Sequence, residues 1–213
     1  MEKQLTVKGL GRVKVTPNVA IVTLRVTTTQ QEYEQLLSEV NQRMQRLETV
    51  LLTAGLSKED IKTTAFSIHP KEKMNQENEW QLVGYEAYQE ITLHLTLEQA
   101  YLTTILTAVA ESGVHPVLSV QFTVAQQEVV EQQLLLQATE NGRRQAELLA
   151  EAANVQLGEL LQIEYTPRAT EFLSSTMLQS EKISHHLTIP MLHPADIIEE
   201  AAVTFIWQIE EEK

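Results

Sequence analysis

A strict alternation of apolar and polar residues opens the chain and constrains its fold more than any other feature. One side of the alternation is apolar and the other is polar: Leu5, Val7, Val13 and Val15 against Thr6, Lys8, Arg12 and Lys14. A period of two residues predicts a β-strand that buries only one of its faces. Gly9 and Gly11 fall on the apolar side, where the missing side chains permit a helix to pack closely.

The same alternation returns along the chain and predicts further half-buried strands. They cover residues 19–27, 61–69, 85–95, 118–124, 161–165 and 201–209. Thr16-Pro17-Asn18 is a turn signal, because proline fixes φ and asparagine tolerates unusual backbone angles. We therefore expect the first two strands to form a hairpin. Residues 70–82 are rich in Lys, Glu, Asn and Gln, which predicts an exposed hairpin loop.

Three segments have apolar residues at steps of three and four and are predicted to be helices. They are residues 37–54, followed by Gly55, and two segments near residues 98–112 and 127–154. The longest carries a ridge of small residues, namely Ala138, Gly142, Ala146, Ala150 and Ala153. A glycine inside a helix costs about 1 kcal/mol relative to alanine. Gly142 is therefore expected to allow close approach of another element.

Strands with one apolar face, combined with three helices, predict an α+β fold. We expect a two-layer sandwich, with about three helices on one face of a mainly antiparallel sheet. The whole chain, residues 1–213, is expected to form a single domain, and the last strand, with Val203, Phe205 and Trp207 on one face, to lie inside the sheet. Residues 167–196 lack a sustained period and are interpreted as an excursion that is mobile or contacts a partner.

Charge is unevenly distributed in this acidic chain. The formal net charge is −13, with a balance of +3 over residues 1–73 and −16 over residues 74–213. Such acidity argues against nucleic acid or an anionic membrane as partner. Head-to-tail contact between copies would pair the opposite charges, so we expect a homo-oligomer. The candidate interface residues are the charged residues on the polar sheet face: Lys8, Arg12, Lys14, Glu86, Glu90 and His94.

Cysteine is absent, which excludes disulfides, thiolate metal ligands and a cysteine nucleophile. The N-terminal residues run directly into a strand pattern and show no apolar leader segment. No stretch approaches the roughly 18 apolar residues of a membrane helix. We therefore expect a cytoplasmic protein.

The opening residues 7–20, VKGLGRVKVTPNVA, resemble the start of SIMPL-domain proteins, a family of unknown function. Further similarities follow in order: Gly55 with Thr63-Thr64, Gly84-Tyr85, Gly113 ahead of Phe122, the small-residue helix ending at Leu157-Gly158, and the stretch from Pro194 to Ile209. The sequence departs from the family pattern at Asn18, where aspartate is usual, and at Ala195, where glycine is usual. It also lacks the leader segment of family members that resemble periplasmic antigens.

The resemblance implies an α+β fold and a tendency to assemble into oligomers. It also implies loose associations with stress tolerance and signalling, and no agreed reaction. The envelope roles of periplasmic members transfer poorly to a chain without a leader segment.

One cluster of residues is a candidate metal site. His185, His186, His193 and Asp196 carry imidazole and carboxylate groups, which bind zinc and similar metals. Their spacing matches no standard signature, and solvated loop histidines are the favoured interpretation. Nearby serines at positions 174, 175 and 180 lack a nucleophile elbow or an oxyanion frame.

The sequence therefore predicts a non-enzymatic, self-assembling protein that acts as a protein-binding or scaffold module. Its expected partners are further copies of itself, with other proteins as an open option, and no cofactor is expected. The alternative is a metal-binding protein or hydrolase that uses His185, His186 and His193.

Overall fold

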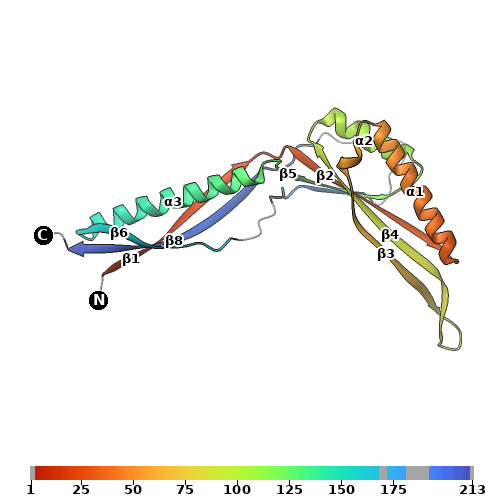
Figure 1. Cartoon of the computed structure of the whole chain (residues 1–213), viewed down its shortest axis with the longest axis horizontal. Helices are drawn as coiled ribbons and strands as arrows, with labels where there is room; N and C mark the ends of the chain where they lie inside the picture. Colours follow the sequence, from red (N-terminus) through yellow and green to blue (C-terminus); the bar gives the residue numbers. More distant parts are fainter. Residues whose placement is uncertain (1–2, 168–171, 181–191, 212–213) are drawn as a thin grey trace. The chain divides into compact units, whose positions relative to one another are not determined.

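The structure, a computed structural model, describes residues 3–167, 172–180 and 192–211. They group into two compact units, each assembled from segments distant in the sequence. Unit 1 draws on residues 1–16, 124–173 and 195–213, and unit 2 on residues 17–123 and 174–194. Each unit combines helix with antiparallel sheet (Figure 1).

Unit 1 contains a sheet with three strands among the described residues. The strand order is β1 (Gln4–Val15), β8 (Ile197–Glu211) and β6 (Val155–Glu164). β8 pairs antiparallel with the whole of β1, from Gln4 opposite Gln208 to Val15 opposite Ile197. The last strand of the chain thus lies inside a sheet, as its alternation predicts.

Helix α3 (Gln127–Ala152) covers one face of this sheet at unusually short distance. A Cβ atom on Gly9 would lie 2.0 Å from the carbonyl oxygen of Ala138, and one on Gly11 would lie 2.0 Å from that of Leu134. No side chain fits at such distances. The two glycines therefore allow the backbones of strand and helix to touch, which confirms the close packing predicted for them.

The core of unit 1 lies between α3 and the sheet. One cluster of buried residues consists of Val13, Val124, Val130, Leu134, Phe172 and Ile197, and a second of Ala138, Val203 and Phe205. The ridge of small residues predicted for the long helix faces this core at Ala138, Gly142, Ala146 and Ala150, which are buried. Ala153, the last residue of the predicted ridge, follows the end of the helix and is exposed.

Unit 2 contains a sheet with five strands among the described residues. The order is β3 (Ile61–Met74), β4 (Trp80–Thr96), β2 (Val19–Gln30), β5 (Val117–Thr123) and β7 (Met177–Ser180), and every neighbouring pair is antiparallel. β2 does not pair with β1, so the predicted hairpin is wrong. Asn18 is instead bonded to the sheet of β2, because its N–H donates to the carbonyl of Thr123 and its carbonyl accepts from the N–H of Leu97.

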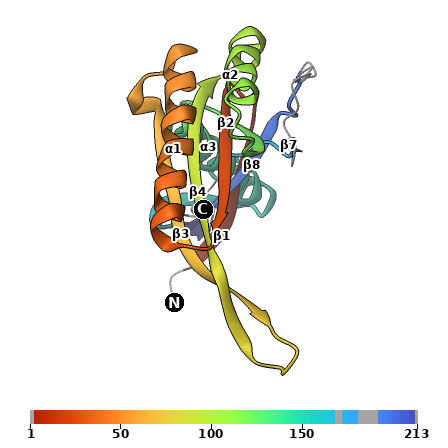
Figure 2. The ribbon, with the colours of Figure 1, turned by 90° about the vertical axis from the view of Figure 1, so that its right-hand side faces the viewer.

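Two helices lie over this sheet, α1 (Tyr33–Thr53) and α2 (Gln99–Glu111) (Figure 2). Between them in the chain come a short 3₁₀ turn at Lys58–Asp60 and the hairpin β3–β4. Leu47 and Leu51 of α1 and Ile105 and Val109 of α2 are fully buried against Val22, Leu24, Ile91, Leu93 and Phe122 of the strands. Burial of each large apolar side chain contributes about 1.5–3 kcal/mol before entropy costs. Among the described residues, no helix is both long and apolar enough to cross a membrane.

The predicted α+β class, the three helices and the antiparallel strands are confirmed. The strands are divided between two sheets, and the helices are divided with them, α3 to one and α1 and α2 to the other. Alternation does not reveal this division, because a strand with one buried face has the same pattern in either sheet.

The loop predicted at residues 70–82 is shorter than its composition indicates. β3 continues to Met74 and β4 begins at Trp80, so only residues 75–79 form the turn. The strands there are exposed on both faces, and a strand without a buried face carries mostly polar side chains. Its sequence therefore resembles a loop.

Part of the predicted excursion at residues 167–196 is integrated into the two units. Phe172 is buried in the core of unit 1, and residues 177–180 form β7 at one edge of the sheet of unit 2. Leu192 packs against the core of unit 2, and its N–H donates to the side-chain oxygen of Gln99. Residues 168–171 and 181–191 lie outside the described residues.

Candidate functional site

The predicted histidine cluster is only partly placed. His185 and His186 lie outside the described residues, and His193 is exposed. Asp196 is already engaged: one carboxylate oxygen accepts from the Thr16 hydroxyl at 2.8 Å, and the other lies 2.9 Å from the Lys14 ammonium. Both contacts hold the pKa of Asp196 below its usual value. Within the described ranges, no group of three or more histidine or carboxylate side chains is placed to hold a metal ion.

Three of the six predicted interface residues lie on β1 in unit 1, on the sheet face opposite α3. Lys14 pairs with Asp196, and the Arg12 guanidinium lies 3.5 Å from the Glu200 carboxylate of the neighbouring strand. Lys8 is exposed beside Thr204 in the register. Two of these three cations therefore have partners within their own sheet.

The other three predicted interface residues lie on β4 in unit 2; they are Glu86, Glu90 and His94. Arg25 of β2 binds Glu90 at 2.9 Å, and Lys71 lies 3.8 Å from Glu86. The pKa of Glu86 is lowered, first by a hydrogen bond donated by the Tyr88 hydroxyl and then by one from Thr29. His94 is exposed on the same face.

The alternation in the sequence predicts one charged sheet face that carries all six residues. The structure places them on two different sheets. Opposite charges meet across neighbouring strands of the same sheet. Exposed pairs of this kind are worth about 0–1 kcal/mol each. The arrangement has the character of a solvated surface whose charges are largely balanced locally.

A different surface, which the sequence interpretation missed, is the end of the β3–β4 hairpin. The last residue of β4 that pairs with β2 is Tyr85, so from Gly84 to the turn β4 has only β3 beside it. We call residues 71–84 the hairpin arm. It extends past the start of α1, as Figures 1 and 2 both show.

The hairpin arm exposes large apolar side chains. Trp80 is 67% exposed, Leu82 50% and Met74 47%. Met74 is opposite Trp80 in the register and Glu72 is opposite Leu82, so these four residues share one face. The signal was available in the sequence as apolar residues at alternate positions on either side of the turn, within an otherwise polar segment.

The turn of the arm is organised by one side chain. The amide oxygen of Asn75 accepts hydrogen bonds from the N–H groups of Glu77 and Glu79, each at 2.9 Å. The backbone closes with a bond from Asn75 N–H to the Glu79 carbonyl, and Asn78 adopts a left-handed conformation with φ of 61°. Asparagine tolerates this region better than most residues. These hydrogen bonds order the turn of the arm.

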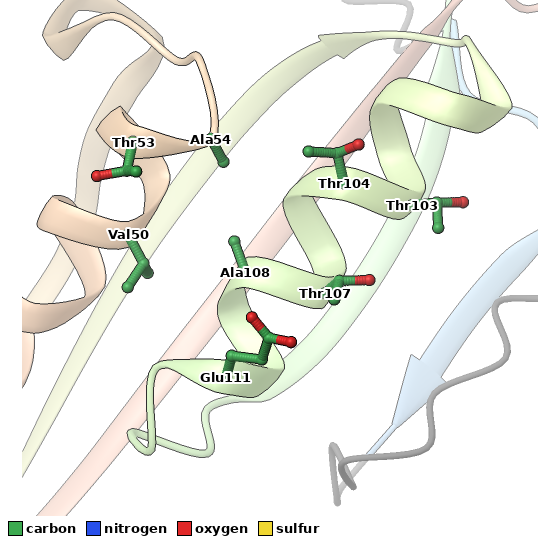
Figure 3. A pocket seen from close by; sticks show the side chains of 8 residues that line it. All are labelled: Val50, Thr53, Ala54, Thr103, Thr104, Thr107, Ala108 and Glu111. Atoms are coloured by element: carbon green, nitrogen blue, oxygen red, sulfur yellow. The ribbon is translucent and has the colours of Figure 1, made fainter.

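A groove of about 510 Å³ lies between α1 and α2 on the outside of unit 2. We call it the α1–α2 groove; its lining residues are Val50, Thr53, Ala54, Thr103, Thr104, Thr107, Ala108 and Glu111. Figure 3 shows Val50 and Ala54 facing α2, with Ala108 opposite them and Glu111 at one end.

Three of the four threonine hydroxyls that line the groove are bonded within their own helices. The hydroxyls of Thr53, Thr103 and Thr104 donate to the carbonyls four residues earlier in their own helices, at 2.8, 2.8 and 3.0 Å. A hydroxyl bonded in this way needs no water. The groove therefore offers methyl groups and satisfied hydroxyls, a surface suited to binding an apolar side chain.

Comparison with known proteins gives the family. The model of the SIMPL family, described as a protein of unknown function (DUF541), matches residues 5–191. The chain is also similar to the "Uncharacterized protein YggE" of Edwardsiella ictaluri (strain 93-146), with 27% identity over 158 residues, which cover 74% of this chain and 65% of the relative. The chain thus spans somewhat less than two thirds of the length of this relative. Because the family model matches residues 5–191, well over half of this 213-residue chain, the chain belongs to the SIMPL family.

Proposed function

We propose that this protein is a non-enzymatic, self-assembling module that binds protein surfaces, its own copies first, and serves as a scaffold. The observation that carries the proposal is the hairpin arm, with its exposed Met74, Trp80 and Leu82.

The arm has the properties of a contact element. A two-stranded ribbon is at best marginally stable in water when no third strand or helix supports it. Tryptophan and methionine are enriched at the centres of protein interfaces. A clustered apolar face on such a projecting ribbon favours a protein partner over permanent exposure to solvent.

The charged sheet faces contribute less to this proposal. Arg12, Lys14 and Arg25 pair with carboxylates of their own units. Assembly through the arm is therefore expected to survive salt, since burial of apolar surface is not screened.

Light scattering coupled to size exclusion tests the proposal. We expect a mass that is a multiple of the 24.1 kDa chain mass, retained from about 0.1 M to about 1 M salt, where the Debye length falls from about 10 Å to about 3 Å. A single species of chain mass under both conditions contradicts self-assembly. Loss of the larger species in 1 M salt alone identifies the charged faces, and not the arm, as the contact.

A further inference from the structure

The hairpin arm presents one side chain suited to act as an anchor. Trp80 is the most exposed large apolar residue among the described residues, and it stands beside the turn that Asn75 fixes. A buried tryptophan removes about 150–250 Å² from water. The hydrogen bonds of the turn reduce the entropy that docking of the arm would cost.

The α1–α2 groove has room for such an anchor and carries apolar side chains. Its volume of about 510 Å³ lies within the roughly 300–1,000 Å³ of pockets that enclose small organic molecules. Val50, Ala54 and Ala108 supply apolar walls, and three of the four threonine hydroxyls in the lining are already bonded within their helices, so that they add little desolvation cost.

One pair of charges beside the two surfaces is complementary, while Glu111 in the lining of the groove has the same sign as Glu72. Arg46 lines a hollow that shares Val50 and Glu111 with the groove, and Glu72 lies on the Trp80 face of the arm. Neither Arg46 nor Glu72 makes an ion pair within the described part of the chain. Docking of the arm would bring a free cation beside a free anion, which favours this orientation over others.

The groove of the same chain is out of reach of its own arm. The arm leaves the sheet beside the first residue of α1, where the rings of Tyr33 and Tyr85 are 5.4 Å apart. The groove begins at Val50, near the other end of α1. A rise of about 1.5 Å per residue places the two ends of this stretch roughly 25 Å apart, and the arm points away from the groove (Figure 2). Only a second copy can therefore bring an arm to the groove.

From these observations we infer that the hairpin arm of one copy docks into the α1–α2 groove of a second copy, with Trp80 entering the groove and Glu72 beside Arg46. This inference rests on the proposed self-assembly and names its contact. Two different patches meet, so the contact is heterologous and each copy keeps one free arm and one free groove. Repetition then produces a ring or a filament.

Three single variants test the contact from its two sides. Trp80→Ala removes the anchor from an exposed position, and Ala108→Trp fills the groove; Thr104→Arg is a second groove variant at an exposed position. Each is expected to weaken association about 30-fold or more, as truncation of an anchor side chain does. Gln81→Ala, on the opposite face of the arm, is the matched control and should assemble like the parent.

A mixing experiment is specific to the head-to-tail arrangement. Copies with Trp80→Ala keep an intact groove, and copies with Ala108→Trp keep an intact arm. Each variant alone should run at the 24.1 kDa chain mass, and an equimolar mixture should give a species of about twice that mass and nothing larger. A double variant carrying both changes should stay at chain mass in every mixture.

Reversal of charge tests the orientation. Glu72→Arg and Arg46→Glu should each weaken association, and the two changes combined in one chain should restore it. Restoration requires that the two residues meet across the contact, because each variant alone leaves two like charges facing each other.

The outcomes separate this inference from the proposed function. An oligomeric parent whose mass is unchanged by Trp80→Ala overturns the docking and leaves self-assembly intact. A parent at chain mass overturns both. Fluorescence of the Trp207→Phe variant, in which Trp80 is the remaining tryptophan, tests contact with phosphatidylcholine–phosphatidylglycerol vesicles. If the parent runs at chain mass and the Trp80 emission shifts on these vesicles, the arm is a membrane-contacting element and the inference is overturned.

Discussion

Gly142 of α3 lies directly against the aromatic ring of Phe205 in β8: a Cβ atom on residue 142 would be 2.6 Å from two carbons of the ring. On the other side of the same contact, the Cα atom of Gly9 would be 3.3 Å from that Cβ. The glycine is therefore required by packing, and it offsets its cost in helix propensity by letting the helix reach the sheet.

Gly142→Ala should consequently destabilise the protein by about 1–3 kcal/mol, the usual range for overpacking in a core. In an ordinary helix the same change would stabilise by about 1 kcal/mol. Urea denaturation of parent and variant measures the difference. Arg144→Ala, two residues on at an exposed position, is the control and should change the free energy of unfolding by less than about 0.5 kcal/mol. An increase in stability for Gly142→Ala contradicts the packing described here.

The features that the sequence predicts well are those set by local periodicity. The long helix, its small-residue ridge and the close approach at Gly142 all follow from spacing along one segment. The assignment of strands to sheets does not, because β1 and β2 have the same alternation and a turn signal between them, yet pair with different partners. That choice depends on which helix covers each apolar face, a contact between residues far apart in the chain.

The candidate site shows the same limit of prediction from local periodicity. The alternation of Lys14 and Glu90 with apolar residues places each on a polar strand face, but it does not indicate to which sheet that face belongs. The polar composition of residues 70–82 predicts a loop and gives no weight to Trp80 alone. Read individually, Met74, Trp80 and Leu82 form an alternation that indicates continued strands with one apolar face.

The central position of β8 makes the stability of unit 1 sensitive to Phe205. Its side chain is 2% exposed, so Phe205→Ala should cost about 3–5 kcal/mol. Trp207 is only partly buried, and its ring centroid lies 6.5 Å from that of Phe205. Trp207→Ala should therefore lower the free energy of unfolding by less than Phe205→Ala does. Denaturant midpoints of the two variants provide the comparison, and equal losses would place Trp207 as deep in the core as Phe205.

Trp207→Phe is expected to be nearly neutral. The indole Nε1 is buried and makes no hydrogen bond with the described residues. Phenylalanine keeps an aromatic ring beside Phe205 and removes an N–H group that is buried without a partner. Its denaturant midpoint should lie close to that of the parent. A loss as large as that of Trp207→Ala would show that the indole makes a polar contact beyond those described.

Asp196 should give the stability of the protein a specific dependence on pH. Its pKa in the folded state is lowered from the ordinary value of 3.8 by Lys14 and Thr16, so the folded state binds the proton less readily than the unfolded state. The contribution of Asp196 to stability is therefore fully present above its unfolded pKa, and it is lost as the pH falls through the lower folded pKa. Asp196→Asn should be less stable than the parent at pH 7, and the difference should shrink below about pH 4. Urea titrations at several pH values measure it; a difference that grows on acidification has the wrong sign.

The turn of the hairpin arm should depend on the acceptor atom of Asn75. Asn75→Ala leaves the N–H groups of Glu77 and Glu79 without their intramolecular partner. A loss of about 1 kcal/mol per hydrogen bond corresponds to roughly fivefold faster amide exchange in this segment. Asn75→Asp retains the acceptor oxygens and should restore protection, whereas Gln76→Ala, an exposed neighbour, should leave the exchange unchanged. Hydrogen exchange of peptides covering residues 74–82 measures all three. If Asn75→Asp exchanges as fast as Asn75→Ala, the carbonyl-type acceptor is not what orders the turn, and the fixed presentation of Trp80 loses its support.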